Sequence, residues 1–473
     1  MGIIQGIKDY RLLRKNMYRM TRSEVRAYQR EQLLQMVDYA ALHSPFYKDL
    51  YQGKLLQTEK NQAEENRAEE ILNSDWWKAF FSLPIINKQI MMDHFDDLNT
   101  CGLKKEEALE FAMNQELSGD YAGYYRDKYV IGLSSGTSGN KGIFVTPREM
   151  TERLPSVFLA RGGIPLSYLP FRILFLLRVF SQGFSDINSP FIKLNYMSTM
   201  TKPEELIDKI NAKRLTIIMA PPSMLRILSS HSKMIKIPIK MIVSYAEVLE
   251  KEEKEKIKKA FNCKVTEIYQ ASEGQLGSTC KCGNLHINED LVFVELYDEE
   301  GSVLDEPGKM ASRMLVTNLI NKAQPLIRYE MNDLIVLGEK CTCGSAFRVI
   351  EKILGRHDDV LYLKTLGGEI KAVFPDLFAR WIITTDDQIR EFKVFQKSNE
   401  ELAILIDLNQ LVNQNSEVAI IEKLSQRIAR ELKKFEIKCK LTVTCVTIAL
   451  PEKMSKYKRF ESNMAVQPLQ IRT

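Results

Sequence analysis

The sequence lacks any uninterrupted apolar run of the roughly 18 residues that a membrane-spanning helix needs. Its most apolar stretch, LPFRILFLLRVF, is interrupted by Arg172 and Arg178. The first thirty residues carry repeated charges and no apolar segment typical of a secretory signal. Gly6 stands where a myristoylation signal requires Ser or Thr. We therefore expect a cytoplasmic chain with no transmembrane segment.

The sequence also lacks the charge density of a nucleic-acid-binding protein, since its net charge of +5 is spread over 473 residues. The positive excess lies near the start, in Lys8, Arg11, Arg14, Lys15, Arg19, Arg22, Arg26 and Arg30. Because apolar residues are interleaved with these cations, the segment has two interpretations. We favour a helix packed on the body by its apolar side, and a helix on a membrane surface is the alternative.

The length predicts more than one domain, because a single hydrophobic core rarely serves 473 residues. The first 125 or so residues are rich in helix formers, and the polar run QTEKNQAEENRAEE reads as an exposed helix or loop. From Lys128 onward, short β-rich runs such as YVIGL, RILFLL, LTIIMA, IKMIVSY and CKVTEIY alternate with helical patterns. A second αβ unit follows Gly355. The pattern predicts an α/β fold with domains at 1–354 and 355–473.

Eight cysteines without a secretory signal favour reduced thiols or metal ligands over a disulfide framework. Four of them form two short pairs about sixty residues apart, Cys280 with Cys282 and Cys341 with Cys343, each followed by a glycine. Two such hairpins can supply the four soft ligands that Zn²⁺ takes in a closed structural site. His286 is an alternative ligand for one of the cysteines, and four unrelated buried thiols are the interpretation without a metal.

The segment LSSGTSGNKG predicts a phosphate-binding loop between two strands. Its glycines permit the close backbone approach by which N–H groups surround phosphate oxygens, and its hydroxyls and lysine add donors and charge. The residues concerned are Ser134, Ser135, Gly136, Thr137, Ser138, Gly139, Lys141 and Gly142. A Walker A loop is excluded because the lysine is followed by glycine and by β-rich sequence instead of a helix.

This loop resembles the phosphate loop of the acyl-adenylate-forming superfamily, and later motifs follow in the family's order. YQASE resembles its Tyr-Gly-x-Thr-Glu motif, PLIRYEMNDL its Tyr-Arg-Thr-Gly-Asp segment, and GRHDDVL its hinge. SPFYKDLY, LHINED, CTCG and RVIEKILGRHDDVL are similar to the phenylacetate-CoA ligase branch and its capsule-biosynthesis relatives. The resemblance implies a large amino-terminal adenylate-forming domain of layered α/β sheets and a small mobile α+β domain.

The resemblance also implies roles for individual residues. Glu273 would hold Mg²⁺ and Ser272 would bond the α-phosphate, since a hard cation takes carboxylate oxygen and a hydroxyl donates to phosphoryl oxygen. Asp333 would accept hydrogen bonds from the ribose. Further nucleotide contacts are expected from Ala246, Glu247, Tyr269 and Arg356. The sequence departs from the family at Glu330–Asn332, where an arginine that orients the ribose carboxylate is missing, so weaker binding is expected.

The last segment predicts the catalytic lysine of the mobile domain. LPEKMSKYKRF aligns with the family's Pro-Arg-Thr-x-Gly-Lys-x-x-Arg if Ser455 stands for glycine, which makes Lys456 the lysine that neutralises developing charge. Lys458 is the second choice, and a solvated basic tail is the interpretation without catalysis. Asp358 falls at the hinge position.

Together these features predict an enzyme that uses ATP and Mg²⁺ to activate a small carboxylic acid as acyl-AMP. Transfer to a thiol, on CoA or on the phosphopantetheine of an acyl carrier protein, would follow. Two alternatives stay open, an adenylyltransferase whose end product is the AMP adduct and a non-catalytic nucleotide-binding member. The identity of the acid and the existence of a homodimer are also left open by the sequence.

Overall fold

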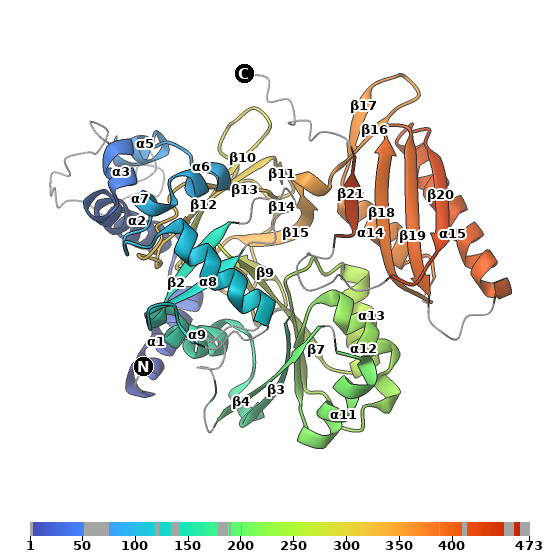
Figure 1. Cartoon of the computed structure of the whole chain (residues 1–473), viewed down its shortest axis with the longest axis horizontal. Coiled ribbons are helices and arrows are strands. Elements are labelled where there is room, and N and C mark those ends of the chain that lie inside the picture. Colours follow the sequence, from blue (N-terminus) through green and yellow to red (C-terminus); the bar gives the residue numbers. More distant parts are fainter. Residues whose placement is uncertain are drawn as a thin grey trace.

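The computed structural model describes residues 3–51, 75–118, 123–133, 142–177, 188, 191–199, 201–386, 388–408, 414–448 and 458–463. Helices and strands alternate through a large body, and a smaller carboxy-terminal part lies beside it (Figure 1). The α/β class predicted from the sequence is confirmed. The polar run at 57–70 lies outside the described residues.

The basic amino-terminal segment forms helix α1 (Ile3–Arg19), which packs by one side on α9 (Arg148–Arg161). Leu13 is buried there, and Asp9 pairs with Arg153 at 3.2 Å. The packed helix that we favoured is therefore what the structure contains. Its other side exposes Ile4, which is 73% accessible. Within the described residues, no helix is both long and apolar enough to cross a membrane.

The next helices form one wall of the main core. They are α2 (Arg22–His43), α3 (Pro45–Leu50), α5 (Asp75–Phe81), α6 (Lys88–Asp93), α7 (Phe95–Leu98) and α8 (Lys105–Ser118). The helix α2 begins at a capping box in which Thr21 and Glu24 satisfy each other's backbone N–H groups, so its start is set locally. Trp77 is fully buried against Phe293, which anchors these helices to the strands behind them.

The central sheet has ten strands in the described part of the chain, in the order β11-β14-β15-β9-β8-β7-β6-β5-β3-β4. One half is parallel and consists of β3 (Phe171–Leu177), β4 (Ile192–Ser198), β5 (Ile217–Ala220), β6 (Met241–Tyr245) and β7 (Lys264–Ala271). The helices α11 (Pro203–Lys213), α12 (Pro222–Ser230) and α13 (Lys251–Phe261) connect these strands. Every residue of β5 and β6 is buried, as expected for parallel strands covered on both faces.

The other half of this sheet is antiparallel. It consists of β8 (Gly274–Thr279), β9 (Leu285–Ile287), β15 (Val349–Arg356), β14 (Asp333–Gly338) and β11 (Met310–Ala311). Beside it lie the three-stranded sheet of β10 (Val292–Tyr297), β12 (Arg313–Asn318) and β13 (Tyr329–Met331) and the hairpin of β1 (Tyr129–Leu133) and β2 (Ile143–Pro147). Short 3-10 turns are η1 (Leu166–Tyr168), η2 (Ser232–Met234) and η3 (His357–Asp359).

The carboxy-terminal part has a core of its own. Its elements are β16 (Leu361–Lys364), β17 (Ile370–Val373), α14 (Pro375–Ile383), β18 (Ile389–Ser398), β19 (Glu401–Leu408), α15 (Gln414–Lys434), β20 (Lys440–Cys445) and β21 (Phe460–Ser462). The sheet order is β20-β19-β18-β21, and α15 buries Ile420, Leu424, Ile428 and Leu432 against it. Residues four apart share one helix face, so this single stripe seals the sheet.

Candidate active site

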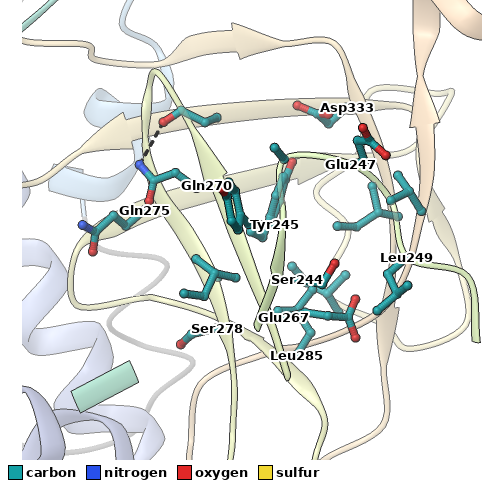
Figure 2. A pocket seen from close by; sticks show the side chains of 18 of the residues that line it. Ser244, Tyr245, Glu247, Leu249, Glu267, Gln270, Gln275, Ser278, Leu285 and Asp333 are labelled. Carbon is teal, nitrogen blue, oxygen red and sulfur yellow. Dashed lines mark hydrogen bonds between the residues drawn. The ribbon is translucent and has the colours of Figure 1, made fainter. Parts of the chain in front are cut away.

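A cleft of about 2290 Å³ extends along the carboxyl ends of β6 and β7 and reaches β14, β15 and the start of β21. Ser244, Tyr245, Glu247, Gln270 and Asp333 line it, and Figure 2 shows their side chains around one space. Ligand sites of α/β sheets lie at such strand ends, where successive loops diverge. The position of the cleft therefore follows from the topology of the parallel half.

The segment after β6 has an unusual backbone. Ala246 has a φ of +68°, a left-handed conformation that a non-glycine residue seldom adopts and that clusters at functional sites. The turn is held on one side by the Tyr245 hydroxyl, which donates to the carbonyl of Leu176. On the other side, Glu247 accepts from the N–H of Ser223 at 3.1 Å and from its hydroxyl at 2.8 Å. The segment expected to hold adenine is thus fixed at both ends.

Asp333 and Arg356 face each other at the open end of the β14–β15 hairpin. They are register partners, and their charged groups lie 3.7 Å apart. Tyr269 lies beside them, and its pKa is raised well above the usual value by burial and by the Asp333 carboxylate. We expected Asp333 to lack an orienting arginine because of the substitutions at 330–332. The structure supplies that arginine from the neighbouring strand, which sequence alignment with the family motif does not show.

Ser272 and Glu273 form the turn between β7 and β8. Ser272 is exposed, and Glu273 is half-buried with its main-chain carbonyl held at 2.8 Å by the Asn318 amide. Below it, the pKa of Tyr329 is raised by burial and by the Glu273 carboxylate. A carboxylate at a tight, anchored turn that opens on a cleft is suited to a hard cation such as Mg²⁺.

Lys88 is a site residue that the sequence analysis missed. It is the first residue of α6, after the Asn87 cap, and it lines the same cleft. Burial lowers its pKa, and the Glu273 carboxylate opposes that effect, so the two charges are close enough to interact. In the sequence, this residue is marked only as a lysine directly after LPIIN. Its proximity to Glu273, which lies 185 positions later, is given only by the tertiary structure.

Several predicted residues lie outside the described residues. These are Ser134, Ser135, Gly136, Thr137, Ser138, Gly139 and Lys141 of the phosphate loop, and Lys456. The strands on both sides of the loop are described, and Leu133 pairs with Ile143 across the antiparallel β1–β2 hairpin. The two strands predicted to flank the loop are therefore confirmed, and the buried Gly142 directly precedes the second of them. Lys458 and Arg459 line the cleft.

The predicted hinge residue Asp358 lies in η3, between β15 and the carboxy-terminal part. The Asn332 amide donates to its carboxylate at 3.4 Å, and the His357 N–H donates to the Asn332 carbonyl at 2.8 Å. The chain thus leaves the main sheet beside Asp333. A rotation about this point would carry the carboxy-terminal part across the cleft.

A second cluster lies at the closed end of the same hairpin, where Cys280, His286, Cys341 and Cys343 are all buried. Their ligand atoms lie within 4.8 Å of one another. The sulfurs of Cys280 and Cys341 are 3.8 Å apart, and Cys343 Sγ lies 3.6 Å from His286 Nε2. A tetrahedral Zn²⁺ with bonds of about 2.3 Å to sulfur and about 2.0 Å to nitrogen requires separations of roughly these lengths.

The surroundings of this cluster also suit metal ligands. Backbone N–H groups of residues 282, 343 and 345 point at the sulfurs of Cys280, Cys341 and Cys343. His286 Nδ1 lies 2.9 Å from the Phe347 carbonyl, a partner that keeps the proton on Nδ1 and leaves Nε2 as a ligand. Each ligand atom is therefore directed into the same space.

Cys282 does not belong to this group. We expected four cysteines, with His286 as the alternative for one of them, and the structure assembles the alternative. Cys282 is exposed, and its sulfur is 3.9 Å from the Thr342 hydroxyl. The reason is geometric, because Gly283 at positive φ turns the chain and β9 then carries His286 inward while Cys282 stays at the surface.

No family model matches the chain. Among curated proteins, the chain is similar to a phenylacetate-coenzyme A ligase of Thermus thermophilus, with 30% identity over 162 residues. The match covers 31% of this chain and 35% of that protein, so it spans about a third of the curated relative's length.

Solved structures match over a larger part of the chain. The structure of 2-hydroxyisobutyryl-CoA ligase in its postadenylation state with 2-HIB-AMP has a TM-score of 0.71 at 15% identity, covering 95% of this chain and 91% of that one. The chain therefore has the fold of this ligase. The fold implied by the motif resemblance is therefore confirmed.

Two further solved structures match with lower TM-scores. The same ligase in its thioesterification state with 2-HIB-AMP and CoA has a TM-score of 0.55 at 16% identity, covering 96% of this chain and 92% of that chain. A benzoate CoA ligase from Burkholderia xenovorans has a TM-score of 0.50 at 14% identity, covering 67% and 66%. The coverage of 2-hydroxyisobutyryl-CoA ligase is nearly equal in its two states, but the TM-score is higher for the postadenylation state. The two parts of this chain are therefore arranged more as in that structure.

Proposed function

We propose that this protein is an acid–thiol ligase that uses ATP to convert a small carboxylic acid to its acyl-AMP and then transfers the acyl group to a thiol. The observation that carries the proposal is the convergence of unlike charged groups in one cleft. Glu273 and Lys88 both line it and interact electrostatically, Asp333 is paired with Arg356, and the strained turn at Ala246 lies in the same lining.

Two balanced steps describe the reaction. A carboxylate oxygen of the acid attacks the α-phosphorus of ATP, the bond to the bridging oxygen breaks, and pyrophosphate leaves. The thiol then loses its proton, its sulfur attacks the acyl carbon, and AMP leaves. The first step gathers negative charge, which cations fixed in advance stabilise at little reorganisation cost. Lys88, Arg356 and, from the sequence, Lys141 and Lys456 would supply them.

Individual residues would divide this work. Asp333, held by Arg356, would accept hydrogen bonds from the ribose hydroxyls, and Glu247 and Tyr269 would border the adenine. Ser272, exposed at the β7–β8 turn, would donate to the α-phosphate. Glu273 would hold Mg²⁺, which when bound neutralises phosphate charge. The loop at 134–142 would surround the outer phosphates.

The second metal in this proposal is structural. Zn²⁺ held by Cys280, His286, Cys341 and Cys343 would clip the β8–β9 turn to the β14–β15 connection. Four protein ligands fill a tetrahedral site, so no position is left for substrate. The separations of 3.8 Å and 3.6 Å within the cluster support this assignment. Elemental analysis of protein purified without chelators should find about one equivalent of zinc.

Membership of the phenylacetate-CoA ligase branch is part of the proposal and is supported by the partial match to the Thermus enzyme. CoA is the acceptor that we expect, and phosphopantetheine on an acyl carrier protein is the alternative. We also propose that residues 355–473 move as a unit about Asp358 between the two steps.

The deciding experiment is ATP–pyrophosphate exchange with a panel of aryl and aliphatic carboxylic acids, followed by product analysis with and without CoA. An acid-dependent exchange and a CoA-dependent thioester are expected. Exchange that leaves free acyl-AMP as the end product, whatever thiol is added, would favour the adenylyltransferase. ATP binding without exchange for any acid would favour a non-catalytic member.

A further inference from the structure

A network of charged side chains joins the carboxy-terminal part to the main body. Arg226 on α12 is its centre, and its guanidinium pairs with Glu253 on α13 and with Glu391 on β18. Its Nε also donates to the main-chain carbonyl of Arg390 at 3.2 Å. Figure 1 shows α12 and α13 beneath the sheet that contains β18. One arginine of the main body thus holds both the side chain and the backbone of a strand in the other part.

Arg459 continues the network toward the cleft. Its guanidinium lies 2.9 Å and 3.3 Å from the two carboxylate oxygens of Glu391, and 3.5 Å from Glu247. Its carbonyl accepts from the Val394 N–H at 2.6 Å, so its backbone is fixed to β18. Glu391 is therefore shared by two guanidiniums, one from each part of the chain, and the second of them reaches the segment that borders the adenine position.

These groups are withdrawn from water. The side chains of Arg226 and Glu391 are each 11% exposed, that of Arg459 is 13% exposed and that of Glu253 is 2% exposed. Burial alone would raise the pKa of Glu391, but Arg226 and Arg459 lower it to about 2. The carboxylate is thus charged at neutral pH, and removing its charge leaves two buried cations with less compensation.

We propose that Arg226, Glu391 and Arg459 form an interdomain latch that positions the carboxy-terminal part for the adenylation step. This inference rests on the proposed function, because it assigns the latch to one of that reaction's two poses. Lys456 precedes Arg459 by three residues in the sequence, and the latch would act on adenylation through that short connection. Arg226 and Glu391 act through that placement and are positioning residues.

The latch can release the carboxy-terminal part as well as hold it. A rotation about Asp358 separates Glu391 and Arg459 together from Arg226, because both stand on the carboxy-terminal part. Each separated side keeps an internal pair, Arg226 with Glu253 and Arg459 with Glu391. The exposed charges then regain hydration, which offsets the lost attraction. Contact between Arg459 and Glu247 also makes the latch sensitive to what occupies the nucleotide side of the cleft.

The test is Glu391→Gln, a change that keeps side-chain shape and removes the shared charge. Arg226 is not the first choice for substitution, because its loss removes the cation that pairs with the buried Glu253 and can prevent folding. We expect adenylation to slow about 10-fold or more, at little change in the rate of transfer from supplied acyl-AMP to CoA. Equal losses in the two half-reactions would overturn the latch and indicate a structural role.

The matched control is Asp407→Asn. Asp407 on β19 pairs with Arg390 on β18 at 2.6 Å, and the two side chains are 7% and 23% exposed. This variant therefore weakens a largely buried ion pair that lies entirely within the carboxy-terminal part. Its ratio of the two half-reaction rates should stay within about two-fold of the wild-type ratio. The same asymmetry in both variants would overturn the proposal.

A readout independent of activity separates this inference from the proposed function. Small-angle X-ray scattering should give one compact arrangement for the wild type and for Asp407→Asn, and a broader distribution of interatomic distances for Glu391→Gln. If no acid supports adenylation, the proposed function fails, and the scattering still decides whether the latch exists. If adenylation is found but scattering is unchanged in Glu391→Gln, the latch alone is refuted.

Discussion

The two ends of the β14–β15 hairpin carry opposite kinds of site. At the closed end, Cys341 and Cys343 meet Cys280 and His286, all of them buried, with backbone N–H groups already directed at the sulfurs. At the open end, Asp333 faces Arg356 across the first register pair, and Arg356 is 44% exposed on a cleft. The strands β14 and β15 therefore connect a buried Cys/His cluster at one end with a solvent-accessible ion pair at the other.

The difference shows how one hairpin serves two purposes. At the closed end every ligand atom points inward, so a bound ion would have no position for substrate and would only fix the chain. At the open end the charges are paired but still accessible, so a ligand can add hydrogen bonds to them. A rigid closed end keeps the strands in register, and that register places Asp333 opposite Arg356. The following predictions test this division of labour, beginning with the largest effect.

Glu273→Gln should lower the rate of ATP–pyrophosphate exchange by about 10²-fold or more, the scale for losing a preorganised electrostatic group. Its melting temperature should change little, because the main-chain carbonyl that Asn318 holds is retained. Exchange rates at saturating Mg²⁺ and thermal unfolding of the same preparations check both expectations. A variant that loses stability and activity in parallel would mean that the open end is structural as well.

Cys343→Ser should lower the free energy of unfolding by about 3 kcal/mol or more, since the binding free energy of a structural zinc adds to that of folding. Denaturant unfolding and elemental analysis measure the two quantities together. Cys282→Ser is the matched control, because Cys282 is exposed and lies outside the cluster. It should keep its zinc and its stability. Loss of zinc in both variants would restore the four-cysteine site expected from the sequence.

Glu289 should make the closed end sensitive to acid. It is buried, and although burial opposes its charge, Arg348 and Arg22 lower its pKa from 4.5 to about 2. Arg348 precedes β15, and its Nε lies 2.9 Å from Glu289. A lowered pKa in the folded state adds stability that is complete above pH 4.5 and is lost as pH falls through about 2.

The size of that effect is roughly 3 kcal/mol, from about 1.4 kcal/mol for each pKa unit. Unfolding free energies of the wild type and of Glu289→Gln, measured from pH 6 to pH 2, should converge by about this amount on acidification. A difference that stays constant with pH would mean that Glu289 keeps an ordinary pKa in the folded protein.

Lys88→Ala should give the smallest of these effects, about a 10-fold loss in the exchange rate with little change in stability. The lysine is half-buried and interacts electrostatically with Glu273, so its charge acts in the cleft but is partly screened by water. Lys104→Ala is the control, because Lys104 is exposed and pairs with Asp96 away from the cleft. Equal losses in the two variants would remove Lys88 from the site.

Features that depend on neighbouring residues could be predicted from the sequence. The strands of the parallel half, the stripe of apolar residues on α15 and the two strands around the loop at 134–142 follow from local periodicity and turn chemistry. The motif order also pointed to Glu273, Asp333 and the turn at Ala246, which all line the cleft, while their roles stay predictions. These inferences need no knowledge of which segments meet.

Features that depend on which segments meet had to come from the tertiary structure. Arg356 replaces the missing arginine beside Asp333 because β14 and β15 are antiparallel neighbours. His286, not Cys282, completes the thiol cluster because β9 pairs with β15 and carries the ring inward. Arg226 reaches Glu391 across 165 positions of sequence. In each case, strand register or domain packing places a charged group or a metal ligand. Neither can be deduced from the spacing of residues along the chain.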